Sequence, residues 1–168
     1  MTRIQFLRDL RHAAKTYGTE NIVYFDESGF ESHTYRPHGW AERGKKIYCD
    51  VQGKREKKTN LIMALRGKDY LAPILFQGSC ESKTVLYWIK EHLLKELTKP
   101  SIIVMDNAPI HNKSKIAALL AEHGHILLSL PPYSPDFNPI ENSFAHLKKR
   151  RQFLPEGTPL DALFIGNS

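Results

Sequence analysis

The sequence predicts an α/β domain built on one mixed β-sheet with helices on both of its faces. Residues 22–25 and 102–105 are two runs of four apolar side chains without polar alternation, and each run is followed by an aspartate. Such runs are typical of central strands that are covered on both faces. A hairpin-like pair of apolar segments lies between the runs, and helical patterns alternate with strands after it. Parallel and antiparallel pairing are therefore both expected within one sheet.

The first element is an amphipathic helix over residues 4–17, which Gly18 terminates. The first strand follows and ends at Asp26. Residues 31–59 then form a polar, basic excursion, and compact domains usually keep connections of this length for function. The remaining elements are, in order, a hairpin of residues 60–65 and 70–76, an amphipathic helix at 82–97, a strand at 102–106, a helix at 113–123, a strand at 126–130 and a last helix that begins near Asn138.

The length and composition of the chain suit one globular domain. Its 168 residues, 41% of them hydrophobic, suffice for one core but hardly for a second. We expect a helix or linker at residues 1–19, a core at 20–151 and a short tail at 152–168. Cys49 and Cys80 form neither a metal-type pair nor a disulfide framework, which favours a reducing cytoplasm. No apolar run approaches the roughly 20 residues of a membrane span, so no membrane partner is expected.

Basic residues outnumber acidic ones by 24 to 18 and are clustered. A clustered excess favours a polyanionic partner such as nucleic acid, although a solvated basic surface would give the same count. The candidate DNA-binding residues are Arg43, Lys45, Lys46, Lys54, Arg55, Lys57, Lys58, Lys148, Lys149, Arg150 and Arg151.

Asp26 and Asp106 are the acids at the ends of the two apolar runs. If the two strands are parallel neighbours, their backbones lie about 4.8 Å apart, and both carboxylates emerge at the same edge of the sheet. Carboxylates held this close repel unless a cation neutralises them, and all-oxygen ligands favour Mg²⁺ or Mn²⁺ over zinc. The sequence therefore predicts a divalent-cation site that needs a further ligand from another element.

Glu141 can supply that ligand from the first turn of the last helix, with 34 residues between it and Asp106. The same segment has a structural alternative. Asn138 as N-cap, Pro139 at the first helical position and Glu141 three residues past the cap form a variant capping box. A lone aspartate at a strand end is also usually a turn residue. Only the conjunction of all three acids points to an enzyme that cuts and rejoins phosphodiesters.

Four segments of the chain resemble the bacterial insertion-sequence branch of the mariner superfamily of DDE transposases. They are FDESGF at 25–30, WAERG at 40–44, VMDNAPIH at 104–111 and LPPYSPDFNPIE at 130–141. The resemblance covers roughly residues 20–151 and is most specific in its last segment. It implies a ribonuclease H-like core in which Asp26, Asp106 and Glu141 are the catalytic and metal-binding triad.

The resemblance also implies cofactors and partners. Two Mg²⁺ or Mn²⁺ ions about 3.5–4 Å apart would clamp the scissile phosphate, so that DNA is cut at transposon ends and joined to target DNA. Double-stranded DNA is the expected partner, with a homodimer in the active complex and the basic excursion against DNA or the other subunit. His111 matches a family position, and Asn107 and Asn142 adjoin two of the acids, so all three are candidates for contacts that orient the site. A loop or cap role stays open for His111.

The chain departs from the family pattern in two places. Only one helical pattern precedes Asp26, so we expect no helix-turn-helix region for recognising transposon ends, and the tail after Arg151 is short. Phe144 stands where relatives often carry tryptophan. Two alternatives remain, a catalytically silent, truncated remnant that binds DNA or partner transposase, and a stand-alone ribonuclease H-like nuclease. The three acids argue against a decayed site, and the last motif favours the transposase over the nuclease.

Overall fold

The structure is a computed structural model that describes residues 2–30, 59–108, 111–155 and 157–164. The basic residues predicted between Arg43 and Lys58 lie outside these ranges, together with the second family motif. Among the described helices, none combines the length and apolar character that crossing a membrane requires.

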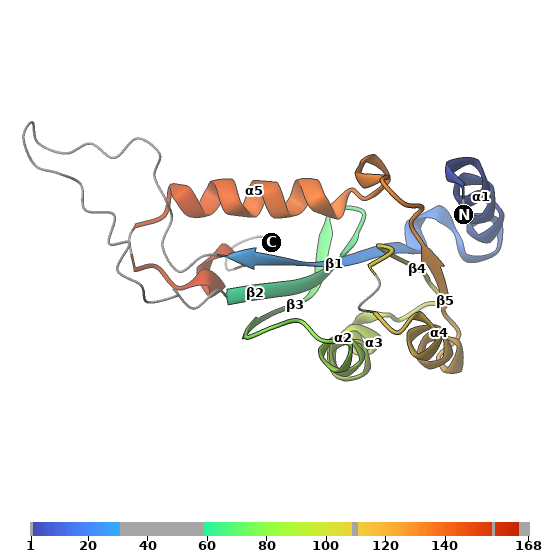
Figure 1. Cartoon of the computed structure of the whole chain (residues 1–168), viewed down its shortest axis with the longest axis horizontal. Coiled ribbons are helices and arrows are strands. Elements are labelled where there is room, and N and C mark those ends of the chain that lie inside the picture. Colours follow the sequence, from blue (N-terminus) through green and yellow to red (C-terminus); the bar gives the residue numbers. More distant parts are fainter. Residues whose placement is uncertain (1, 31–58, 109–110, 156, 165–168) are drawn as a thin grey trace, which may run out of the picture.

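The described strands form one five-stranded mixed sheet in the order β3-β2-β1-β4-β5 (Figure 1). Their bounds are β1 Ile22–Phe30, β2 Thr59–Arg66, β3 Asp69–Gln77, β4 Ile102–Met105 and β5 Ile126–Ser129. The two pairs β1–β2 and β2–β3 are antiparallel, whereas β1–β4 and β4–β5 are parallel. The predicted mixed sheet, its hairpin and the parallel pairing of the two acid-bearing strands are therefore confirmed.

Strand β1 is longer than the sequence suggested, because it continues to Phe30 instead of ending at Asp26. Its pairing with β4 ends at Tyr24 opposite Val104, but its pairing with β2 runs on to Phe30 opposite Thr59. Strand β2, the antiparallel partner, supplies the backbone hydrogen bonds of the polar second half of β1. Asp26 thus lies just beyond the point where the sheet divides and one side of β1 loses its neighbour.

Helices cover both faces of the sheet (Figure 1). The longer helices are α1 Arg3–Tyr17, α2 Ser82–Trp88, α4 Lys113–Glu122 and α5 Ile140–Gln152, and the predicted helix at 82–97 continues past α2 through a π-helical turn, Ile89–Leu93, into α3 Leu94–Glu96. Short 3-10 turns occur at Thr19–Asn21, Pro135–Phe137 and Leu160–Leu163. Helices α1 and α5 lie on one face, and α2 and α4 lie on the other.

Helix α1 is attached to the loop that leads into α5. Arg3 makes a two-pronged ion pair with Asp136, with Nη1–Oδ1 at 2.9 Å and Nη2–Oδ2 at 2.6 Å. Its guanidinium also lies 4.0 Å from the centre of the Phe137 ring, which stacks on Phe6 at 5.7 Å. Phe6 itself is buried against the β4 side of the sheet. The first helix is thus packed onto the core and holds the approach to α5.

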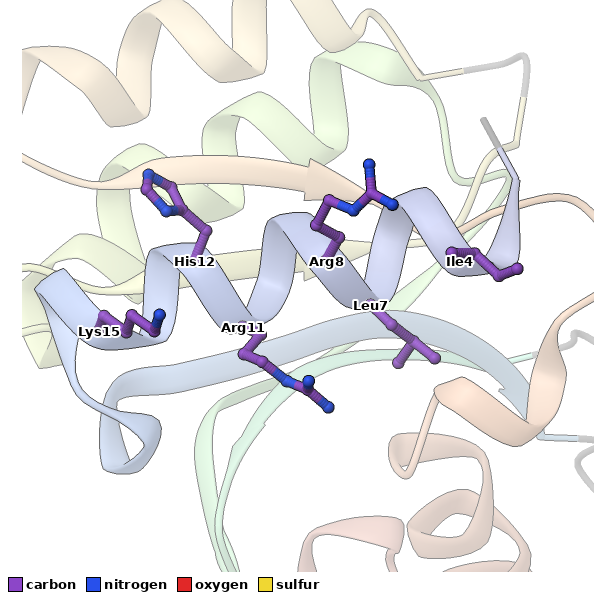
Figure 2. Close-up of a pocket in the computed structure, with 6 residues that line it drawn as sticks. All are labelled: Ile4, Leu7, Arg8, Arg11, His12 and Lys15. Atoms are coloured by element: carbon purple, nitrogen blue, oxygen red, sulfur yellow. The ribbon is translucent and has the colours of Figure 1, made fainter.

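The outer face of α1 carries a shallow hollow of about 420 Å³ (Figure 2). Two apolar side chains that are largely exposed, Ile4 and Leu7, alternate there with basic ones. The lining residues are Ile4, Leu7, Arg8, Arg11, His12 and Lys15, all from this one helix. The hollow contains no carboxylate, so it is separate from the predicted cation site.

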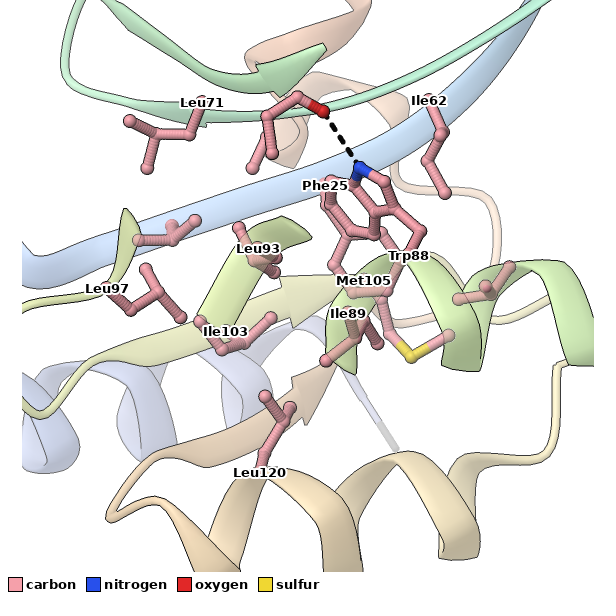
Figure 3. Close-up of a cluster of buried hydrophobic side chains, with 14 of the residues drawn as sticks. Phe25, Ile62, Leu71, Trp88, Ile89, Leu93, Leu97, Ile103, Met105 and Leu120 are labelled. Carbon is pink, nitrogen blue, oxygen red and sulfur yellow. Dashed lines mark hydrogen bonds between the residues drawn. The ribbon is translucent and has the colours of Figure 1, made fainter. Parts of the chain in front are cut away.

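Trp88 is the largest side chain of the core between the sheet and α2 (Figure 3). It packs against Phe25, with ring centres 5.4 Å apart, directly before Asp26 in β1. Its indole Nε1 donates a hydrogen bond of 2.8 Å to the carbonyl oxygen of Ala72. Ala72 has a φ of 50° and lies where the β2–β3 register shifts, so Trp88 satisfies a carbonyl that the irregular ladder leaves unpaired.

We expect Trp88→Ala to lower the free energy of unfolding by about 3–5 kcal/mol, because it leaves a large cavity in the core. Trp88→Phe keeps most of the volume but strands the Ala72 carbonyl, at a cost of about 1–3 kcal/mol. Urea unfolding monitored by circular dichroism measures both. The adjacent Tyr87 is 63% exposed, and Tyr87→Ala should change the unfolding free energy by less than about 0.5 kcal/mol. Equal losses for Tyr87→Ala and Trp88→Ala would contradict this account.

Candidate functional site

The parallel register of β1 and β4 places Asp26 beside Asp106. The last β1–β4 pair is Tyr24 with Val104, and each aspartate follows two residues later in its chain segment. Because side chains alternate along a strand, Asp26 and Asp106 are expected on the same face as Tyr24 and Val104, which is the face that α1 covers. Neighbouring strand backbones lie about 4.8 Å apart. The charge of Asp106 is among the causes that raise the pKa of Asp26, which agrees with the predicted proximity of the two acids.

Hydrogen bonds fix both oxygens of the Asp26 carboxylate. Oδ1 accepts a bond of 2.8 Å from the backbone N–H of Glu27, and Oδ2 accepts one of 3.4 Å from Nδ2 of Asn138. The Asp106 carboxylate is held through Oδ1, which accepts a bond of 3.3 Å from the N–H of Ala108. Each aspartate is therefore oriented by donors from its own loop or from the entrance to α5.

Glu141 lies in the first turn of α5, where the sequence placed it, and is exposed. The predicted capping-box alternative is wrong for this helix, because Pro139 is its N-cap and no side chain caps it. The Asn138 side chain is instead turned to Asp26, and only its backbone carbonyl accepts from the Glu141 N–H, at 3.2 Å. The local cap therefore does not account for either Asn138 or Glu141.

The pKa of Asp26 is raised from 3.8 to about 7. Burial is the largest cause, because it penalises the charged carboxylate, and repulsion from Asp106 is the next. The Glu27 N–H opposes the rise, while the charges of Glu27 and Glu141 add to it. The other two predicted acids thus both act on Asp26 electrostatically, and Glu141 is the smallest of the named causes.

The donor chemistry of this edge suits a hard divalent cation. Carboxylate oxygens predominate, and two buried oxygens beside them, Oε2 of Glu27 and Oδ1 of Asn138, have no hydrogen-bond partner among the described residues. Within the described part of the chain, however, no three His, Cys, Asp or Glu side chains lie close enough together to hold one ion. The convergence of Asp26, Asp106 and Glu141 on shared metal therefore stays a prediction, even though two of the three are neighbours.

His111 is buried behind Asp106. Its Nε2 lies 3.4 Å from Oε1 of Glu27 and 3.7 Å from Oδ1 of Asp106. The hydrogen bond with Glu27 is the main cause that raises the pKa of His111, with burial opposing it. Glu27 is not among the site residues that the sequence predicted. The structure instead makes it the partner of His111, 84 positions away, a pairing that no local pattern could reveal.

The other candidates divide into residues that contact the site and residues that do not. Asn107 accepts a hydrogen bond from Lys113, and Asn142 is exposed without a contact to a described carboxylate.

Cys80 lies near Glu27, and burial together with that carboxylate raises the pKa of its thiol to about 12. A raised pKa lowers the thiolate fraction and so disfavours a nucleophilic role for Cys80.

The basic end of α5 is only partly available to a ligand. Lys148 and Arg151 lie over the Phe30 ring, at 5.5 and 5.8 Å from its centre, and Arg150 donates to the Leu163 carbonyl at 3.3 Å. Lys149 points to solvent. The DNA-binding role predicted for this cluster stays a prediction, and Lys149 is its most accessible member.

Residues 21–155 match the family model described as DDE superfamily endonuclease. The chain belongs to this family. No curated protein sequence matches it. Among solved structures, the fold resembles the Mos1 transposase paired-end complex with the left transposon end, at 20% identity and a TM-score of 0.63, over 88% of this chain and 47% of that one.

Two further solved structures show the same fold. The Mos1 transposase catalytic domain with Raltegravir and Mg matches at 18% identity and a TM-score of 0.61, over 96% of this chain and 76% of that one. The Mos1 mariner paired-end complex with Mn matches at 22% identity and a TM-score of 0.61, over 87% and 48% of the two chains. The predicted ribonuclease H-like fold is confirmed. The chain spans about half the length of the transposases in the two paired-end complexes.

The raised pKa of Asp26 predicts a specific pH dependence of stability. The unfolded chain has the ordinary carboxyl value of 3.8, whereas the folded protein releases this proton only near pH 7. Stability is therefore lost as pH rises from about 4 to 7, and the full cost remains above pH 7. When this DDE superfamily protein is measured without divalent cations, Asp26→Asn should raise the free energy of unfolding at pH 8 by a few kcal/mol. This is roughly the energy that a pKa shift of this size represents.

Thermal and urea unfolding in a chelator between pH 4 and 8 measure this effect. The advantage of Asp26→Asn should grow with pH and level off above about 7. Asp69→Asn, at an exposed carboxylate at the start of β3, is the matched control and should show no such growth. A constant difference between Asp26→Asn and the parent at all pH values would show that Asp26 is not buried as a costly anion.

Proposed function

We propose that this chain is the catalytic domain of a DDE transposase, which cuts DNA at transposon ends and joins the ends to target DNA. The observation that carries the proposal is the parallel register of β1 and β4, whose last pair, Tyr24 with Val104, comes two residues before Asp26 and Asp106. Membership of the DDE superfamily endonucleases and the fold of the Mos1 catalytic domain support it. Its membership of the insertion-sequence branch rests on the four sequence motifs.

Asp26, Asp106 and Glu141 are the residues that would hold two Mg²⁺ or Mn²⁺ ions. Such ions, when bound, stabilise the attacking and leaving oxygens of a phosphodiester. The protein's own part is to present oxygens in fixed directions. The Glu27 N–H orients one oxygen of Asp26, and the Ala108 N–H orients one oxygen of Asp106. Nε2 of His111 lies near the same Asp106 oxygen. These carboxylates bind cations and need not carry protons.

Duplex DNA is the proposed substrate, as transposon ends and as target, and a homodimer is the proposed active assembly. The similar structures are named as paired-end and strand-transfer complexes of Mos1 transposase, which agrees with this proposal. Helix α5 begins at the acids and ends in the basic cluster, so Lys149 lies about 12 Å along the helix axis from Glu141. DNA that follows α5 would meet both.

A catalytically silent remnant that binds DNA is the second candidate. It is favoured by one observation, that the described acids do not form a group tight enough for a shared ion. The two functions differ in one measurable respect, because a remnant binds labelled duplex in Mg²⁺ or Mn²⁺ without nicking it.

We expect the purified protein to nick duplexes that carry candidate transposon ends, and only with Mg²⁺ or Mn²⁺. Asp26→Ala, Asp106→Ala and Glu141→Ala should each reduce the nicking rate by at least about a thousandfold, because each removes a ligand of charge-stabilising metal. Asp69→Ala removes an exposed carboxylate far from the site and should nick like the parent. Gel electrophoresis of end-labelled DNA measures the rates. Binding without nicking by the parent would favour the remnant.

Lys149→Ala should weaken DNA binding uniformly across sequences and lower the slope of log K against log salt by about 0.9, as expected for the loss of one phosphate contact. Fluorescence anisotropy between 50 and 300 mM salt measures the slope. Lys95→Ala, on an exposed lysine of α3 on the opposite face of the sheet, is the control. If the two variants have equal slopes, the end of α5 does not contact DNA.

A further inference from the structure

Asn138 is the buried polar residue of the site for which the fold gives no structural reason. It is 3% exposed, and its Nδ2 donates to Oδ2 of Asp26. Its Oδ1 is buried without a hydrogen-bond partner among the described residues. A buried amide oxygen that loses its bonds to water destabilises the fold unless another group replaces them. Apolar side chains of similar shape avoid this cost, so retaining the amide here needs an explanation.

The backbone does not require asparagine at this position. Asn138 has φ −114° and ψ 88°, which other residues adopt easily, and its side chain does not cap α5. The bond from the Glu141 N–H goes to the backbone carbonyl of Asn138, which any residue has. The side chain therefore matters for what it contacts, and its described contact is Asp26.

Anchors on both sides fix the position of Asn138. On one side, Phe137 is held between Phe6 and the Arg3 guanidinium. On the other side, Ile140 is fully buried in the cluster under α5. Because the position of the amide is fixed in this way, its hydrogen bond of 3.4 Å can orient the Asp26 carboxylate.

We propose that Asn138 is a positioning residue of the cation site, an inference that rests on the proposed function. Its Nδ2 fixes one oxygen of Asp26 while the Glu27 N–H fixes the other, so that the carboxylate is aimed before a cation arrives. Its Oδ1 adds a neutral oxygen of the kind that Mg²⁺ and its bound water accept. An amide is suited to this place because another carboxylate would add to the repulsion that Asp26 already experiences.

The test compares cation affinity with stability in Asn138→Leu and Asn138→Ala. Leucine has nearly the shape of asparagine but lacks both polar atoms. Asn138→Leu removes the unpaired Oδ1 and also the donor to Asp26, two opposing effects, so its stability in a chelator should stay close to that of the parent. It should bind Mn²⁺ about 10- to 100-fold more weakly, the usual effect of losing a group that orients a metal ligand. Isothermal titration calorimetry and the electron paramagnetic resonance of free Mn²⁺ measure the affinity. Asn138→Ala should show the same weakening.

Asn21→Ala is the matched control. Asn21 is also a buried asparagine with one side-chain hydrogen bond, from Nδ2 to the Tyr17 carbonyl at 2.7 Å, but it precedes the far end of β1. Its loss should lower stability and leave Mn²⁺ affinity unchanged. A purely structural role for Asn138 predicts the same pattern for Asn138→Ala, and would overturn the proposal.

A cation-free readout tests the contact itself. The side-chain amide pair of Asn138 should give two separate resonances in the ¹⁵N–¹H spectrum that shift in Asp26→Ala and not in Asp69→Ala. If the parent binds Mn²⁺ through Asp26 but Asn138→Leu binds equally well, the role of Asn138 is wrong and the proposed function stands. If Mn²⁺ binding does not depend on Asp26, the proposed function falls, and the role of Asn138 falls with it.

Discussion

The parallel pairing of β1 with β4 is the constraint on which the site depends. A slip of one residue would turn Asp106 to the opposite face from Asp26, because side chains alternate along a strand. Packing on both faces prevents this slip. Val23 and Ile103 are buried against α2 and α4, while Tyr24 and Val104 face α1. The apolar residues that form the core therefore set the relative position of the two aspartates.

The same pairing makes the site costly to the fold. Asp26 is placed where burial and Asp106 both oppose its charge, which explains why its pKa is raised to about 7. A ligand that binds only the folded state returns stability in proportion to the logarithm of its concentration over its dissociation constant. A cation at this edge would offset the repulsion directly. Stability and cation binding are therefore expected to be coupled in this domain.

The sequence predicted the sheet, the order of its elements and the adjacency of Asp26 and Asp106, because each rests on local apolar patterns that tertiary packing respects. It did not predict that β1 continues to Phe30, since Glu27, Ser28 and Gly29 carry no strand signal and only β2 supports them. The capping box at Asn138 was wrong for a related reason. The pattern fits a cap equally well, and only the fold brings a buried aspartate within reach of the same amide.

Helix α5 connects these observations. Ile140, Phe144 and Leu147 pack on the antiparallel half of the sheet, which directs the start of the helix toward Asp26. The start of a helix carries a partial positive charge from its unpaired N–H groups. That charge favours negative groups near Glu141, whether carboxylates or phosphate. Because the loop before α5 is held by Arg3 and Phe6, the first helix contributes to this arrangement. The position of Glu141 relative to the aspartates thus depends on packing at both ends of the chain.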